Sequence, residues 1–169
     1  MTTVREEGAM SEGARIAERL RRMVGGGAWH GPALAPLLRG VTAEQAAARP
    51  VGQAHTIAEI VRHAVAWQEV VAKRAKGEDA RPTAAEDWPS VEAGEAAWSE
   101  LRERLGRDAA RLAVEIAQMT DEELQANVVR RSHTVAHLLN GLVEHHAYHA
   151  GQVALLKRAL RLAPVESEG

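Results

Sequence analysis

The sequence predicts an all-α protein: a four-helix bundle with long crossover connections and short extra helices. Several long stretches place apolar residues three and four positions apart, which is the period of an amphipathic helix. No stretch shows the two-residue alternation that is typical of a half-buried strand. Because 169 residues fit one domain, we expect a flexible N-terminus over residues 1–12, the bundle over 13–163 and a flexible tail over 164–169.

The N-terminal part of the predicted bundle holds one main helix and two short ones. The main helix is predicted to begin near Ala14 and to end at the three glycines of residues 25–27. Pro32 is well placed as the first residue of a short helix that carries several leucines. Thr42 and Gln45 form a capping box, which predicts one or two further helical turns.

The next two main helices are separated by a long connection. Thr56 and Glu59 form a capping box at the start of the second helix, which ends at Gly77. Residues 77–89 are polar and predict a crossover, which permits the second and third helices to run parallel. The third helix is predicted over about residues 90–119, before a short turn that a threonine caps.

Composition excludes several classes of site and partner. The chain has no cysteine, which excludes disulfides, zinc–thiolate sites, iron–sulfur ligation and a cysteine nucleophile. A formal net charge of −2 gives no electrostatic case for a nucleic-acid or membrane partner. No run approaches the ~20 apolar residues that span a bilayer, and residues 1–13 lack the apolar core of a signal peptide. We therefore expect a cytoplasmic protein.

The last main helix, predicted over about residues 134–162, carries three histidines within five positions. His145 and His149 are four apart, so both imidazoles can point at one metal ion. His146 and His149, three apart, form a competing pair, and periodicity alone does not separate the two pairs. A single histidine on an apolar helix face is more often a buried core residue, but two adjacent buried imidazoles are costly unless something binds them.

A third ligand has to come from another helix. His63 lies on the inward stripe of the second helix, between Ile60 and Trp67, and becomes the natural third ligand beside His145 and His149. Three neutral imidazoles suit zinc, nickel, copper or iron, and three protein ligands leave a coordination position open. The Glu-x-x-His pairs of di-iron bundles and the His-Glu-x-x-His motif of zinc peptidases are both absent.

Four segments carry a family resemblance: Ala28 to Pro32, Ile57 to Trp67, Glu86 to Pro89 and His145 to Gln152. In this order they resemble the DinB superfamily, and within it the YfiT-like branch of metal-dependent enzymes. The resemblance implies a four-helix bundle that binds a divalent metal, often nickel or zinc. It further implies that one histidine of the second helix and a His-x-x-x-His pair of the last helix are the ligands.

In this sequence the resemblance places the metal ligands at His63, His145 and His149, and so favours the pair four apart. Similar proteins are frequently homodimers. Residues 29–38 also put a tryptophan and three leucines outside the main helical seams, and such a patch is sheltered either by folding over the bundle or by a partner subunit. We therefore expect a homodimer, which light scattering would measure.

Other polar residues are weaker candidates for the site. Gln152 shares the helix face of His145 and His149, so it is a catalytic candidate that can orient a bound water or substrate. His30 follows the glycine run on a predicted loop, where it can contact substrate or transfer a proton. Two acidic residues can support a ligand imidazole, although simple solvation is the commoner role; they are Asp108 and Glu115. Packing or structural roles are expected for Tyr148, His55, His133 and His137.

Three functions compete. The first is a metal-dependent thiol S-transferase, because some similar proteins transfer low-molecular-weight thiols onto small electrophiles, and a cysteine-free chain must take its thiol as a substrate. The second is a metal-dependent hydrolase in which a bound water, whose pKa zinc can lower to ~7, attacks a small-molecule substrate. The third is a metal-binding module without catalytic activity.

Overall fold

The computed structural model describes residues 10–162, and over this part of the chain it is all-helical, as predicted. The helices are α1 (Glu12–Gly25), α2 (Leu34–Leu37), α3 (Ala43–Ala47), α4 (Ile57–Ala75), α5 (Ala84–Asp87), α6 (Glu95–Ala117), α7 (Asp121–Gln125) and α8 (Val135–Ala159). Ser11 caps α1, whose first residue, Glu12, lies inside the segment that we expected to be flexible. The remaining predictions for the termini fall on residues 1–9 and 163–169, outside the described residues.

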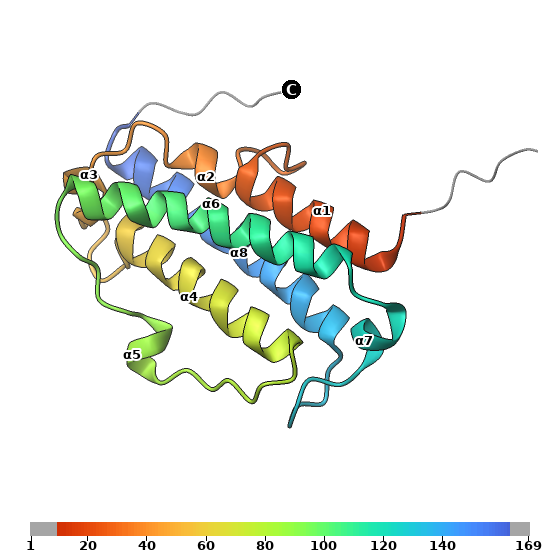
Figure 1. Cartoon of the computed structure of the whole chain (residues 1–169). Helices are drawn as coiled ribbons and strands as arrows, with labels where there is room; N and C mark the ends of the chain where they lie inside the picture. The colour runs from red at the N-terminus through yellow and green to blue at the C-terminus, as the bar shows by residue number, and fades with distance from the viewer. Residues whose placement is uncertain (1–9, 163–169) are drawn as a thin grey trace, which may run out of the picture.

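The four long helices α1, α4, α6 and α8 form the bundle (Figure 1). Two of them, α1 and α8, run in one direction, and α4 and α6 run in the other. Each long helix packs against two others: α1 and α4 both contact α6 and α8. The connection from α4 to α6, which contains α5, returns along the length of the bundle, so that α4 and α6 run parallel.

Capping boxes mark where four of the eight described helices begin. Thr42, Thr56, Thr83 and Thr120 each accept a hydrogen bond from the backbone N–H three residues on, and the Glu or Gln at that position accepts one from the threonine N–H. The box at Thr83, which begins α5 within the crossover, was not predicted. The start of α6 also differs from the prediction, because Gly94 has φ 99° and the helix begins only after it, at Glu95.

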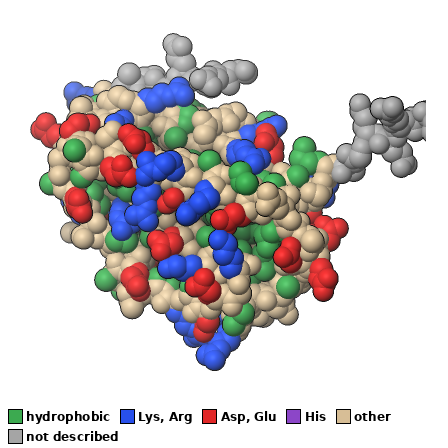
Figure 2. Space-filling model, in the orientation of Figure 1, with side chains coloured by type: hydrophobic (Ala, Val, Ile, Leu, Met, Phe, Trp, Pro, Cys, Tyr) green, Lys and Arg blue, Asp and Glu red, His purple; other side chains and the backbone are tan. Residues whose placement is uncertain are grey.

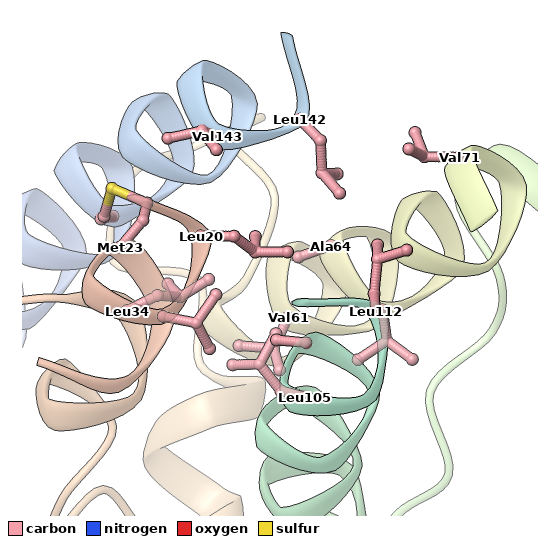
Figure 3. Packing of buried hydrophobic residues seen from close by; sticks show 14 of the residues in the cluster. Leu20, Met23, Leu34, Val61, Ala64, Val71, Leu105, Leu112, Leu142 and Val143 are labelled. Carbon is pink, nitrogen blue, oxygen red and sulfur yellow. The ribbon is translucent and has the colours of Figure 1, made fainter. Parts of the chain in front are cut away.

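The core fills the space between the four long helices (Figure 3). Leu20 of α1, Val61 and Ala64 of α4, Leu105 of α6 and Leu142 of α8 are all buried there. The three leucines of the predicted apolar patch are also buried within the same chain: Leu34, Leu37 and Leu38. Only Trp29 of that patch is fully exposed, so the expectation of a homodimer now depends on the family resemblance rather than on a large uncovered surface.

The outer surface on the face of α4 and α6 mixes lysine and arginine with aspartate and glutamate (Figure 2). Some ion pairs on this face lie within one helix, such as Lys73 with Glu69 at 2.9 Å, and others link two helices, such as Lys76 at the end of α4 with Glu115 of α6 at 2.9 Å. Exposed pairs of this kind contribute little to stability. Within the described residues no helix is long and apolar enough to cross a membrane.

One close approach between α1 and α6 depends on a glycine. A Cβ added to Gly13 would lie 2.5 Å from the backbone oxygen of Ile116, whereas a Cβ added to Gly106 meets nothing within 4 Å. We expect Gly13→Ala to lower the free energy of unfolding by about 1–3 kcal/mol, because the two helices must move apart. The control Gly106→Ala should raise it by about 0.5–1 kcal/mol, because alanine is the better helix residue. Urea unfolding of both variants tests this, and equal effects would contradict it.

Candidate metal centre

Helices α4 and α8 bring three imidazoles together in the interior of the bundle. His63 comes from α4, and His145 and His149 come from successive turns of α8. The Nε2 atom of His145 lies 3.0 Å from Nε2 of His63 and 3.0 Å from Nε2 of His149. One ring nitrogen of each residue lies within 4.8 Å of the others, so the group can hold a metal ion. His63 and His149 are buried, and His145 is half-buried.

The crossover orients His63. Its Nδ1 atom is 2.6 Å from the backbone carbonyl oxygen of Asp87 and 3.3 Å from the carboxylate oxygen Oδ1 of the same residue. Because both neighbours are acceptors, Nδ1 carries the proton and donates it, which leaves the lone pair on Nε2. The same Oδ1 accepts a hydrogen bond of 2.6 Å from the indole N–H of Trp67.

Gln152 orients His149 in the same way. Nδ1 of His149 lies 2.6 Å from Oε1 of Gln152 and donates to it, so the Nε2 lone pair faces the other histidines. The amide nitrogen of Gln152 donates to the hydroxyl of Tyr148 at 3.0 Å. We expected Gln152 to orient a bound water or substrate, but both ends of its amide are engaged by protein groups. We expected Tyr148 to be packed, and its side chain is instead 65% exposed.

The third histidine has no comparable partner. Nδ1 of His145 is buried and makes no hydrogen bond within the described part of the chain. The lone pairs on Nε2 of His63 and of His149 both face Nε2 of His145. The three nitrogens are thus placed to share a proton or to bind one metal ion. Ligands of a tetrahedral zinc ion, with bonds of about 2.0–2.1 Å, lie about 3.3 Å apart, so the observed separations fit a metal ion.

Burial keeps these imidazoles neutral, the form that binds metal. The pKa of His145 is lowered to about 3, first by burial and then by His149, His146 and His63. Burial also lowers the pKa of His63, against the opposing effect of its hydrogen bond to Asp87. The pKa of His149 is lowered by burial as well, against the opposing effect of Gln152.

Aromatic rings cover one side of the centre. Trp88 stacks on His63 with ring centroids 3.9 Å apart and 10° between the planes, and His55 stacks on the other face of Trp88 at 3.5 Å and 5°. The ring centroids of Trp67 and His63 are 6.3 Å apart, with 64° between the ring planes. Asp87 and Trp88 were not predicted to have a role of their own, and their only signal in the sequence was the segment Glu86 to Pro89, which contributed to the resemblance.

His146 is not part of this group and contacts Gln68 of α4 instead. Its side chain is 0% exposed, and its Nε2 accepts a hydrogen bond of 2.9 Å from the amide nitrogen of Gln68. The same amide nitrogen donates to the carbonyl oxygen of Leu105 at 3.3 Å. The structure thus groups the pair four apart on α8 with His63 and leaves the competing pair separated.

The remaining candidates lie outside the centre. His30 is exposed, and within the described residues no hydrogen bond or ring contact joins it to the three histidines. Asp108 and Glu115 form ion pairs with basic residues rather than with an imidazole. His133 and His137 contact each other, with ring centroids 5.3 Å apart.

A family model described as DinB superfamily matches residues 28–153, a span that contains α4, the crossover and most of α8. The chain belongs to the DinB superfamily. No curated protein and no solved structure matches the chain. The function of this member of the superfamily therefore has to be inferred from the arrangement of its own side chains.

The fully buried His146 predicts how the stability of the metal-free protein depends on pH. Burial lowers its pKa from 6.5 to about 3, so between these values the unfolded chain binds a proton that the folded protein does not. The free energy of unfolding should therefore fall as pH falls from 6.5 toward 3, by roughly 1 kcal/mol per pH unit for each such histidine. Urea unfolding with a chelator, at pH values from 4 to 7, measures this slope.

His146→Gln removes one of the groups that produce the slope, so its slope should be shallower than that of the wild type. His137→Gln, at an exposed position of the same helix, is the matched control and should keep the wild-type slope. Equal slopes in all three proteins would contradict the prediction.

Proposed function

We propose that this DinB superfamily member is a YfiT-like, divalent-metal-dependent enzyme with zinc or nickel held by His63, His145 and His149. We propose further that it transfers a low-molecular-weight thiol onto a small electrophile. The observation that supports the metal most directly is the convergence of three neutral Nε2 atoms, two of them with lone pairs fixed by acceptors at Nδ1.

A divalent metal ion in such a centre lowers the pKa of a coordinated thiol or water, so that a thiol loses its proton at neutral pH. The chain itself supplies three uncharged nitrogens and no thiolate, because it contains no cysteine. An incoming thiolate would therefore meet no competing sulfur ligand. The ring of Trp88 covers one face of His63, and His55 stacks in turn on Trp88.

The carboxylates around the site favour thiol transfer over hydrolysis. A hydrolase of this kind benefits from a free general base that accepts a proton from the attacking water. Within residues 10–162, Asp87 is the only carboxylate that contacts one of the three histidines, and its Oδ1 already accepts from Trp67. A thiol has a much lower pKa than water before it binds, so coordination to the metal is enough to release its proton to solvent at neutral pH. Metal-dependent hydrolysis and a non-catalytic metal-binding module are the alternative outcomes of the tests below.

The first expected outcome is one divalent metal ion per chain. Protein made without a histidine tag should, after chelation and reloading with zinc or nickel, retain one equivalent and unfold at a higher temperature than the metal-free form. Alanine at position 63, 145 or 149 should abolish retention and the thermal shift. His146→Gln should keep both, since His146 faces Gln68. Retention of metal by all three alanine variants would contradict the ligand assignment.

The second expected outcome concerns the reaction. Metal-loaded protein is incubated with a panel of small thiols and a bimane-type fluorogenic electrophile, and in parallel with ester and amide substrates. Thiol transfer predicts conjugation above the uncatalysed rate that is lost on chelation and in His149→Ala. Turnover of esters or amides without thiol would favour the hydrolase. Metal binding without turnover of any substrate would favour the non-catalytic module.

A further inference from the structure

We propose that Asp87 and Gln152, which are not metal ligands, are positioning residues that preset the centre before metal binds. They do so by holding the protons of His63 and His149 on Nδ1, so that both Nε2 lone pairs already face the metal position. This inference rests on the proposed metal-binding function and adds to it the residues that set the metal affinity.

The proposal starts from the chemistry of a neutral imidazole. Its single proton can occupy either ring nitrogen, and only the unprotonated nitrogen can bind metal. A partner at Nδ1 that only accepts hydrogen bonds selects the productive form, and it also fixes the plane of the ring. His63 and His149 each have such a partner at 2.6 Å.

Asp87 acts through two acceptors with different roles. Its backbone carbonyl oxygen accepts the proton of His63, and its carboxylate accepts the indole N–H of Trp67 at 2.6 Å. The carboxylate therefore anchors the crossover to α4 at the residue that orients the ligand. Trp88, the next residue, stacks on His63 and restricts the rotation of its ring. The crossover is in this sense a part of the metal site.

Gln152 is itself held in one orientation. An amide can present either its oxygen or its nitrogen, and only the oxygen accepts the proton of His149. Because the amide nitrogen donates to the hydroxyl of Tyr148 at 3.0 Å, the oxygen Oε1 is directed to His149. Gln152 lies three residues after His149, so one turn of α8 carries both the ligand and its support.

His145 shows what the absence of such support means. Its Nδ1 is buried without a hydrogen-bond partner in the described part of the chain, so no acceptor holds its proton on Nδ1. In the metal-free protein its Nε2–H can donate toward the lone pairs of His63 and His149. The preset geometry of the centre therefore depends on the two supported ligands, and removal of either support should be felt in metal binding.

The test compares variants that remove an acceptor with variants that keep it. Asp87→Ala removes the carboxylate that bonds Trp67 and so anchors the carbonyl oxygen beside His63, and Gln152→Leu removes the acceptor of His149. Both should weaken cobalt binding by about 10–100-fold, the usual effect of losing a group that orients a ligand. Asp87→Asn and Gln152→Glu keep an oxygen at the same place and should stay within about threefold of the wild type on the same argument. Glu144→Gln, an exposed change beside His145, is the control and should bind as the wild type does.

Two readouts are independent of enzyme activity. Absorbance of the cobalt-loaded protein gives the affinity and the coordination geometry. Proton–nitrogen correlation spectra of the imidazoles give the tautomers in the metal-free protein, where His63 and His149 should carry the proton on Nδ1. Gln152→Leu should shift His149 toward the form with the proton on Nε2. Asp87→Ala should shift His63 the same way, because the backbone oxygen that accepts its proton is no longer anchored to Trp67. Unfolding in urea with a chelator confirms that each variant is folded.

The outcomes separate this inference from the proposed function. If the wild type binds cobalt and the acceptor-removing variants bind it equally well, or if their tautomers are unchanged, the inference is wrong while the metal centre stands. If the folded wild type binds no cobalt, zinc or nickel, the proposed function is wrong and the inference falls with it. A loss of affinity that is equally large in the acceptor-keeping variants would overturn the positioning role alone.

Discussion

The packing of α4 against α8 is the contact on which the centre depends. Helix α4 contributes one imidazole to the centre, and α8 contributes two. Only when the inward faces of α4 and α8 meet do three imidazoles come within reach of one ion. In the bundle α4 lies between α8 and α6, and it runs parallel to α6. Two neighbouring parallel helices need a connection that returns along the length of the bundle. The crossover therefore serves two purposes: it allows the parallel pair of helices, and it carries Asp87 and Trp88 to the site.

The helices could be predicted from the sequence because their signals are local. Capping boxes at Thr42 and Thr56 involve residues three apart, and the apolar period shows which face of a helix is buried. The inward position of His63 on α4 could be predicted from the same kind of signal. Periodicity did not separate the pair His145 and His149 from the pair His146 and His149, and the family resemblance made that choice. The family match over residues 28–153 is consistent with the whole arrangement.

The remainder of the site could not be predicted, because it depends on how distant segments fold back. Asp87 contacts His63, 24 residues earlier in the chain, through its backbone oxygen, a group that no side-chain motif reports. Gln152 lies on the helix face of the ligands, but side-chain rotamers decide what its amide contacts, and its oxygen accepts from Nδ1 of His149. Its role toward a bound water or substrate stays a prediction. The exposure of Tyr148 could not be predicted either. The helical period gives the direction of its side chain around α8, but it does not show which sides of α8 the neighbouring helices cover.

The stack of His55, Trp88 and His63 gives the centre an intrinsic optical reporter. The chain has only four tryptophans; Trp29 is fully exposed, and Trp98 is buried with its indole N–H donating to the carbonyl oxygen of Val41, away from the histidines. Trp88 lies in ring contact with His63, so a change in the charge or bonding of that imidazole alters the surroundings of the indole directly. Trp67, the fourth tryptophan, also lies near the centre, with its ring centroid 5.8 Å from that of His145. Metal binding should therefore change the emission of these two tryptophans in the unlabelled protein, at concentrations far below those that absorbance or magnetic resonance requires.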